Sequence, residues 1–522
     1  MTDQPALAMG SGPQNITEKR GLVWTSFPPE LRCKIFEYLP GTGRGWSACA
    51  SVCKEWQAEL EKENFRRLKV TAADLETMAA IIPDRANLVR HLWLNIELLR
   101  YSCQACRQRE GKSWYLKNHN LIRKAIEKLW AILSGWRREG AGLTLELSMQ
   151  SPSDKEHFFK NFYFGGEPEG WVFDPSAPPT QRPNMERNIR AGHDEWHHWI
   201  DDRNTTAPFE YALERIFGGV YCSVPRIPAN IPRLPMVDRL EIRRQTRRPF
   251  EPHLLENLVN QLPELKSFTY ELWQKWHVQA QQAADRHHVR FFGLGLPRKL
   301  RELSVFEETN EAFASVFVEG YVGSPPLPNG IRMASPQVGA AFATLSLLLE
   351  KLSVAFMIEA WDFFSAYQPG WVWDNLTSLV LTSRRLIKPE NNQEVDDMER
   401  LLSSAAEVAL SMPVLKTMVI WNFRMGHAFK FYYCAKDTRT DKETVIGWRG
   451  TWDFNPDASV INSWAKVARK NTRYNLRVTP EPNIDEGIKS LAKAIKLLDL
   501  PSEVVHPESL LQMLKEADTS WV

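Results

Sequence analysis

Two cysteines at Cys-x-x-Cys spacing are the residues whose types and separation best suit chemistry. Cys103 and Cys106 have the separation found in zinc sites and in thiol redox centres. A tetrahedral zinc site needs four ligands, yet no second such pair follows, and His119 is the one nearby addition before the next helical stretch. No strand-to-helix context of a thioredoxin-like centre surrounds the pair. We therefore predict a structural pair in a loop, with zinc or redox function as the alternative.

A dense histidine-containing stretch offers a second set of potential metal ligands. His193, His197 and His198 lie beside Asp194 and Glu195, and imidazoles and carboxylates both bind metals. A solvated loop or a short amphipathic turn is the more common reason for such a stretch, and we predict that here. No Gly-x-Ser-x-Gly turn and no Ser-His-Asp order stands out. The sequence thus predicts no catalytic residue, no cofactor and no metal ligand, and a protein that is not an enzyme.

Four arginines form the strongest local run of charge in the chain. They are Arg243, Arg244, Arg247 and Arg248. Guanidinium groups bind carboxylates and phosphates well, so such a run can meet an acidic or phosphorylated partner. A solvated face is the more common explanation of a charge run, and we predict that arrangement for these side chains.

The first element able to position a docking surface is a helix near the N-terminus. Pro28 and Pro29 favour a helix start, because proline is tolerated in a first turn. Leu31, Ile35 and Leu39 follow at a spacing of four, which places them on one helical face. The sequence therefore predicts a short helix with an apolar stripe.

A second apolar series predicts another helix in the same module. Val52 and Trp56 belong to it, and Cys53 flanks the stripe as a small apolar side chain. Two or three short helices within residues 21–70 form a unit too small to bury a large core. Such a unit gains stability by burying its surface on a partner. A helical hairpin that only caps a larger domain is the alternative.

These residues resemble the F-box, a Leu-Pro-x-Glu-Leu opening with spaced aliphatic residues and a later Val-Cys-x-x-Trp. Here the opening is Phe27-Pro28-Pro29-Glu30-Leu31, and Val52-Cys53-Lys54-Glu55-Trp56 follows. The resemblance implies that the module binds a Skp-type adaptor and, through it, a cullin. The adaptor-binding residues that it implies are Pro28, Pro29, Leu31, Ile35 and Leu39, with Val52, Cys53 and Trp56 either packing the helices together or joining the interface.

An apolar sequence motif recurs along the region after the module. Its Leu-x-x-Leu-x-Leu core alternates with period two, which predicts strands. Helical patterns lie between several copies, most clearly over Glu251–Leu262 and Glu394–Ser411. Strand and helix in alternation predict an irregular leucine-rich-repeat-like α/β solenoid, with a plain α/β domain as the alternative. The copies start near Leu88, Leu234, Leu262, Leu296, Leu349, Leu376 and Met412.

The fold class that we predict is therefore mixed α/β, with a small helical F-box followed by this solenoid. Residues 151–204, rich in proline, glycine and aromatic residues, read as an insertion. Near the C-terminus we expect strands at Phe429–Cys434, Thr444–Trp448 and Tyr474–Val478, and helices at Val460–Arg469 and Glu486–Leu498. The predicted segments are a disordered tail at 1–20, the module at 21–70, the repeats at 71–428 and a C-terminal cap region at 429–522.

Composition limits the partners and the cellular compartment that the sequence allows. The 522 residues carry a formal net charge of +2, which argues against a broad basic face for nucleic acid. Seven scattered cysteines indicate a reducing compartment. No signal-peptide pattern appears near the N-terminus, and Val338–Leu349 is too short to span a bilayer. We therefore expect a cytoplasmic or nuclear protein, with no membrane and no nucleic-acid partner.

The order of features along the whole chain is similar to that of filamentous-fungal F-box proteins. The function that this resemblance implies is substrate recognition in an SCF-type cullin ubiquitin ligase, with an unknown protein target held by the repeats. The alternatives are an F-box scaffold that acts outside a ligase and an enzyme with a metal site at Cys103 or at His193–His198.

Overall fold

The computed structural model describes twelve stretches of the chain. They fall in two compact units, Met1–Glu63 and Asn64–Val522, which are treated separately below. The predicted tail at 1–20, residue Leu39 and residues 163–192 of the predicted insertion lie outside the described residues. The described stretches are 24–38, 49–137, 140, 142–162, 193–201, 203–206, 208–219, 231–309, 331–437, 442–472, 474–484 and 487–517.

The first unit is helical where it is described. A short 3-10 helix, η1 (Trp24–Ser26), precedes α1 (Pro29–Tyr38), and α3 (Lys54–Asn64) closes the unit. The carbonyl of Pro28 accepts hydrogen bonds from the backbone N–H groups of Leu31 and Arg32, each at 3.1 Å. The double proline thus starts α1, as its position in the sequence predicts.

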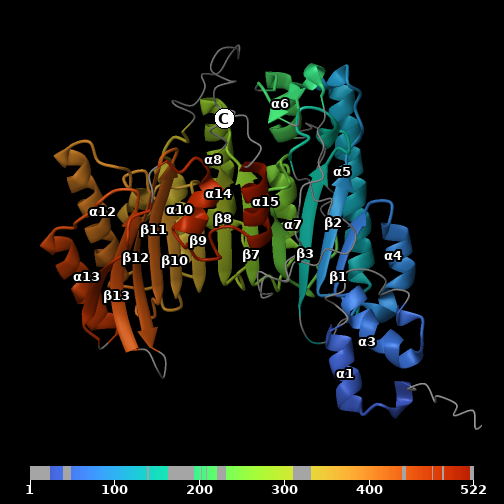
Figure 1. Cartoon of the computed structure of the whole chain (residues 1–522), viewed down its shortest axis with the longest axis horizontal. Coiled ribbons are helices and arrows are strands. Elements are labelled where there is room, and N and C mark those ends of the chain that lie inside the picture. Colours follow the sequence, from blue (N-terminus) through green and yellow to red (C-terminus); the bar gives the residue numbers. More distant parts are fainter. Residues whose placement is uncertain are drawn as a thin grey trace, which may run out of the picture. The chain divides into compact units, whose positions relative to one another are not determined.

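A twelve-stranded, mostly parallel sheet organises the described part of the second unit (Figure 1). Its strands lie side by side in the order of the chain, and only β12 runs antiparallel to both of its neighbours. The predicted mixed α/β class is confirmed. The strands are β1 (Arg67–Thr71), β2 (His91–Glu97), β3 (Leu143–Gln150), β6 (Val237–Ile242), β7 (Ser267–Trp273), β8 (Glu302–Glu308), β9 (Lys351–Ala355), β10 (Ser378–Thr382), β11 (Thr417–Arg424), β12 (His427–Asp437), β13 (Lys442–Gly450) and β14 (Leu476–Pro480).

One row of apolar side chains runs across the parallel part of this sheet, because the Leu-x-Leu alternation places equivalent residues in register. Every second side chain of a strand points to the same face, so this row marks the core side. The residues paired from strand to strand are Leu68, Leu92, Leu145, Leu240, Phe268, Leu303, Leu352, Leu379 and Met418.

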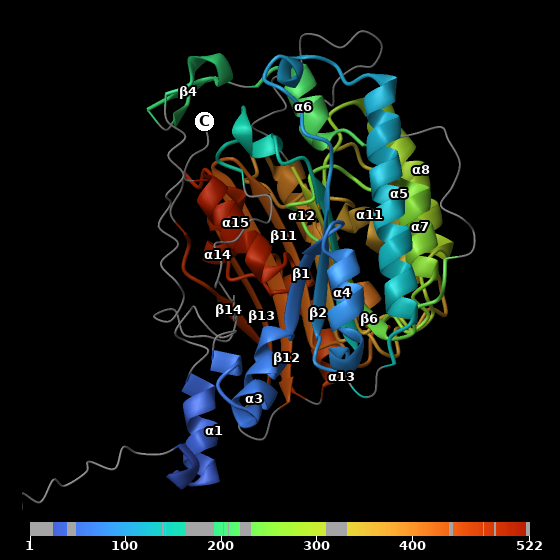
Figure 2. The same ribbon diagram turned by 90° about the vertical axis from the view of Figure 1, so that its right-hand side faces the viewer.

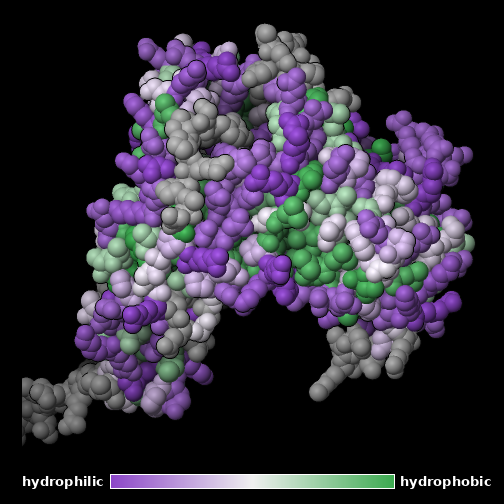
Figure 3. Space-filling model, turned by 180° about the vertical axis from the view of Figure 1, so that it is seen from behind, coloured by the Kyte–Doolittle hydropathy of each residue, from purple (hydrophilic) through white to green (hydrophobic). Residues whose placement is uncertain are grey.

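Helices cover the core side of the sheet and bury this row (Figure 2). The outer surface on this side of the molecule, seen from behind, is hydrophilic over much of its area and has a hydrophobic area near the middle (Figure 3). The helices are α4 (Leu75–Ile81), η3 (Pro83–Arg85), α5 (Lys112–Ser134), α7 (Pro252–Asn260), α8 (Val278–Leu294), α10 (Pro336–Ser346), α11 (Ala360–Ser365), α12 (Asn392–Ala409) and α13 (Ala458–Asn471).

The strand starts repeat one backbone arrangement. Two successive N–H groups at the start of a strand donate to a single carbonyl at the start of the strand before it. Arg301 and Glu302 donate to the carbonyl of Lys266, and Glu350 and Lys351 donate to that of Arg301. The same arrangement recurs at the starts of β2, β10 and β11. The starts of these strands therefore share one backbone geometry even where their sequences diverge.

The C-terminal helices α14 (Leu491–Leu497) and α15 (Pro507–Ala517) lie on the opposite side of the sheet from the helices above (Figures 1 and 2). Ile495 and Leu498 of this segment pack against Val380, Val419 and Trp421 of β10 and β11 in a second apolar core. Residues 429–522 thus contribute three strands to the end of the sheet and a segment that covers its second side. β12, which contains the strand predicted at Phe429–Cys434, is internal to the sheet, and β14 lies at the edge.

The arginine run after β6 is buried, so the prediction of a solvated face is wrong. All four side chains have a relative exposure of 1–2%. Arg243 pairs with Glu508 at 2.6 Å, and Arg244 and Arg247 pair with Glu516 at 2.8 and 2.5 Å. Both glutamates belong to α15, about 260 residues away along the chain. These ion pairs give Arg243, Arg244 and Arg247 internal counter-charges and fasten α15 to the sheet.

Candidate functional site

The predicted adaptor-binding residues divide into exposed and packed groups within the first unit. Leu31 and Val52 are 47% and 65% exposed. Pro28, Pro29 and Cys53 are also exposed, whereas Ile35 is half-buried. Large apolar side chains left open on so small a unit are the feature expected of a docking surface. Leu39 lies outside the described residues.

The remaining predicted residue, Trp56, belongs to an aromatic cluster that joins the helices. Its ring lies 4.9 Å from that of Trp24 and 5.3 Å from that of Phe36, and the latter two rings are 5.3 Å apart. The Glu55 carboxylate accepts hydrogen bonds from Trp24 Nε1 at 2.9 Å and from Arg32 at 2.7 Å. Trp56 therefore takes part in the internal packing of the unit. The exposed residues are not needed for that packing.

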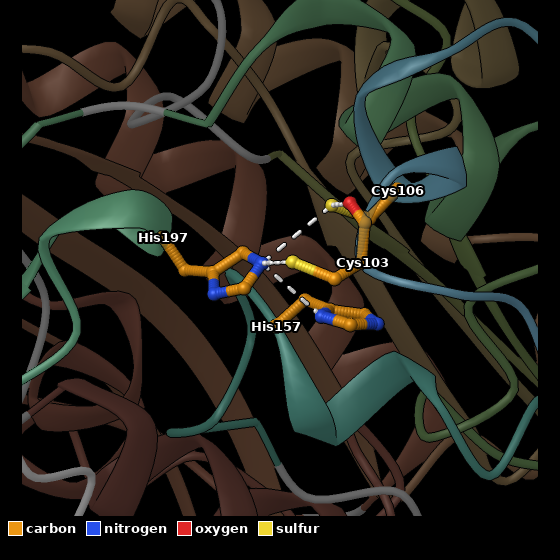
Figure 4. Close-up of side chains that lie close together, drawn as sticks. All are labelled: Cys103, Cys106, His157 and His197. Atoms are coloured by element: carbon orange, nitrogen blue, oxygen red, sulfur yellow. Dashed lines mark hydrogen bonds between the residues drawn. The ribbon is translucent and has the colours of Figure 1, made fainter.

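A second candidate site lies beyond the carboxyl ends of β2 and β3, where two cysteines and two histidines meet (Figure 4). Cys103 precedes and Cys106 lies within η4 (Ala105–Arg107). His157 follows η5 (Asp154–Glu156), and His197 ends η7 (Glu195–His197). The structure thus brings together three loops separated by up to about 90 residues of sequence.

The four side chains converge on one point. His197 Nε2 lies 3.3 Å from the Cys103 sulfur, 3.6 Å from the Cys106 sulfur and 3.2 Å from His157 Nδ1. All four potential ligand atoms lie within 4.8 Å of one another. Cys106, His157 and His197 are buried, and the Cys103 side is exposed.

The far side of the His197 ring is held by a carboxylate. Its Nδ1 lies 2.7 Å from Asp194 Oδ2, and the same oxygen accepts a hydrogen bond from Lys160 at 2.7 Å. Burial would raise the pKa of Asp194, but the hydrogen bonds from Lys160 and His197 lower it to about 2. Asp194 is therefore a fixed anion that orients the imidazole.

Apolar and aromatic side chains shield the group. Cys106 belongs to a core with Phe158, Leu213 and Phe217, the last two on α6 (Glu210–Phe217). Burial raises the pKa of the Cys106 thiol to about 11. Burial also lowers the pKa of His157, and the neighbouring His197 lowers it further. Without a bound cation both groups are neutral at physiological pH.

The cysteine pair is recognisable from its spacing in the sequence, but its two histidine neighbours are not. His119, the addition considered there, lies on α5 outside the cluster. His193 and His198 also stay outside it, and His193 pairs instead with Glu195. His157 carries no local signal at all, since only the fold brings β2 and β3 and their following loops together. The hairpin β4 (Trp199–Ile200) and β5 (Arg203–Asn204) follows His197 and anchors its loop.

A cavity of about 170 Å³ lies at the carboxyl ends of β7 to β11. Gln274, Phe356 and Thr382 line it, together with Asn422 and Arg384. Its lining is largely apolar, with a few polar groups that converge on the space. The carboxyl ends of parallel strands are a frequent position for binding sites.

Next to this cavity, the carboxyl group of Glu307 makes the free energy of unfolding depend on pH. Burial raises its pKa to about 7; Arg332 at 3.0 Å offsets only part of this rise, and the nearby charge of Asp285 adds to it. The folded chain thus binds this proton more tightly than the unfolded chain, whose value is near 4.5. The resulting stability is present below about pH 4.5 and is lost as the pH rises through about 7.

We expect Glu307→Gln to remove this dependence, because glutamine does not titrate. Between about pH 5 and about pH 8 the wild type should lose about 2 kcal/mol more stability than the variant. Urea unfolding of both proteins at the two pH values measures the difference. Parallel pH profiles would contradict the assignment.

Comparison with protein families gives a match to part of the chain. A model described as a family of unknown function (DUF6546) matches residues 295–506, which extend from just before β8 to the loop before α15. No curated protein and no solved structure matches the chain. Within the described stretches, none of the helices combines the length and apolar character required to cross a bilayer.

Proposed function

We propose that the chain is an F-box substrate receptor that links a protein target to a cullin ubiquitin ligase in the cytoplasm or nucleus. One observation carries the proposal. The residues that the F-box resemblance assigns to a Skp-type adaptor include the two exposed large hydrophobic side chains described in the first unit, Leu31 and Val52. The Trp24–Phe36–Trp56 cluster holds that unit together without them.

The larger unit serves in this proposal as a leucine-rich-repeat-like solenoid that holds the target. Two features support a solenoid. The strands follow one another in chain order across the sheet, as stacked units require. The same paired N–H arrangement recurs at the starts of β2, β8, β9, β10 and β11.

The target would bind at the carboxyl ends of β7 to β11. The side of the sheet that solenoids of this kind leave open is covered here by α14 and α15. The cavity beside Phe356 and Arg384 remains accessible and combines apolar walls with polar groups. It can take one side chain of a protein target and fix its orientation.

The mechanism needs no catalytic residue in this chain. The receptor holds a target lysine near ubiquitin activated elsewhere in the ligase. Tethering converts a bimolecular encounter into an effectively intramolecular one and so raises the local concentration of the lysine.

The test is co-purification with a Skp-type adaptor. We expect Leu31→Asp and Ile35→Asp to reduce adaptor binding by at least about 100-fold, because a carboxylate would be placed in an apolar contact. Leu294→Asp is the matched control. Leu294 is 91% exposed at the end of α8 in the other unit, and its change should leave adaptor binding intact.

Retention of the adaptor by both Leu31→Asp and Ile35→Asp, with the wild type binding equally, would refute the docking surface. Failure of the wild type to bind any Skp-type adaptor would do the same. A cullin in the same purification separates a ligase receptor from a scaffold that uses the F-box outside a ligase.

A further inference from the structure

We propose that Cys103, Cys106, His157 and His197 bind one Zn²⁺ ion and that this ion fastens three loops to the carboxyl ends of β2 and β3. The site is independent of adaptor docking, since all four residues lie in the second unit.

The three separations from His197 Nε2 to the other potential ligand atoms are those of a tetrahedral zinc site. With zinc about 2.3 Å from sulfur and about 2.05 Å from nitrogen, the edges of the tetrahedron are about 3.5 Å between nitrogen and sulfur and about 3.3 Å between two nitrogens. His197 Nε2 lies 3.3 and 3.6 Å from the two sulfurs and 3.2 Å from His157 Nδ1. All three distances lie within about 0.2 Å of these edges.

Hydrogen bonds to His197 Nε2 cannot account for all three of its close contacts. His197 Nε2 offers either one proton or one lone pair, yet three polar atoms surround it at 3.2–3.6 Å. At most one of these contacts can be a good hydrogen bond. The Cys106 thiol can donate instead to the Cys103 carbonyl at 2.8 Å, but that bond gives no reason for both sulfurs and His157 Nδ1 to surround His197 Nε2. A cation at the centre satisfies all four at once, with release of the two thiol protons to solvent.

The surroundings of His197 match those of a zinc ligand. A ligating imidazole usually donates its other N–H to a carboxylate, which fixes the tautomer and the ring orientation. Asp194 occupies that position at 2.7 Å from Nδ1 and is itself held by Lys160. This arrangement leaves the Nε2 lone pair directed at the two sulfurs.

A second group of potential ligands in the described chain lacks these properties. His91 lies 3.0 Å from Glu146 and 4.0 Å from Glu241. Arg243 already neutralises Glu146 at 2.8 Å, and its fixed positive charge opposes a metal ion there. At the Cys–His group, the charges of Arg107 and Arg215 favour the Cys106 thiolate, and the two thiols favour zinc over calcium or magnesium.

Four protein ligands leave no open position for water or substrate, so the proposed ion is structural. It would link Cys103 and Cys106 to His157 and His197 and would close a chain segment of about 40 residues between the two histidines. Closing long loops in this way stabilises the folded state by reducing the freedom of the unfolded chain.

The full-length chain, purified without chelator and dialysed against metal-free buffer, tests the site by elemental analysis. We expect about one zinc per chain in the wild type and at least a fivefold loss in Cys106→Ser and His197→Ala. Cys53→Ser and His193→Ala are the matched controls, since neither residue belongs to the group, and both variants should keep the full zinc content.

Cobalt substitution of the wild type gives a readout that needs no variant to fold. Co²⁺ bound by two thiolates and two imidazoles in a tetrahedron produces thiolate charge-transfer bands and intense visible d–d bands. Those bands should appear with a one-to-one end point and disappear on addition of zinc. A folded wild type that takes up neither metal would overturn the proposal, as would full zinc retention in both ligand variants.

Discussion

Replacing Arg243 by methionine is expected to lower the free energy of unfolding by about 3–5 kcal/mol. Arg243 is 1% exposed and lies 2.8 Å from Glu146 and 2.6 Å from Glu508. Burial alone would lower its pKa, but these carboxylates raise the pKa of Arg243 well above its usual value. Methionine fills much of the space yet removes the cation, so buried carboxylates lose their main counter-charge. Urea unfolding followed by tryptophan fluorescence measures the loss.

Arg239→Met is the control for this substitution. Arg239 lies four residues earlier, within β6, and is exposed, so its loss should change stability by less than about 0.5 kcal/mol. Equal effects of the two substitutions would show that the buried ion pairs do not hold α15 on the sheet.

Ile495→Asp is expected to release the C-terminal helices from the sheet. Ile495 is 3% exposed and packs in the core shared with Trp421 and Val380. A carboxylate at this position would be buried without a partner, which costs several kcal/mol whether α14 stays bound or detaches. We expect the free energy of unfolding to fall by about 4 kcal/mol and hydrogen exchange to rise in α14 and α15.

Leu497→Asp provides the matched comparison on the same helix. Leu497 is 43% exposed, so a carboxylate there stays in water and should change stability by less than about 0.5 kcal/mol. Protection of α14 and α15 that remains unchanged in Ile495→Asp would mean that the second core does not anchor this segment.

The attachment of α14 and α15 to the sheet limits where the proposed target can bind. If α14 and α15 are fastened both by ion pairs and by an apolar core, the sheet side beneath them is closed in the folded protein. The proposed target position at the strand ends then follows, because the cavity there does not depend on displacing the C-terminal segment.

Local periodicity in the sequence was enough to predict many elements of the larger unit. The helix expected at Glu394–Ser411 is α12 (Asn392–Ala409), and the alternation from Leu376 gives β10 (Ser378–Thr382). The segment Val460–Arg469 lies within α13. Such elements are readable because apolar spacing of 3.6 or 2 residues is a local property of the chain.

Contacts between distant segments were decided by the tertiary structure alone. The arginine run reads as a solvated face because its partners, Glu508 and Glu516, lie far along the chain. The Cys103–Cys106 pair lacks visible partners for the same reason, since His157 and His197 reach it only through the adjacent ends of β2 and β3. Spacing within a segment fixes which face a side chain occupies, whereas charge pairing and ligand sets depend on which segments the sheet places side by side.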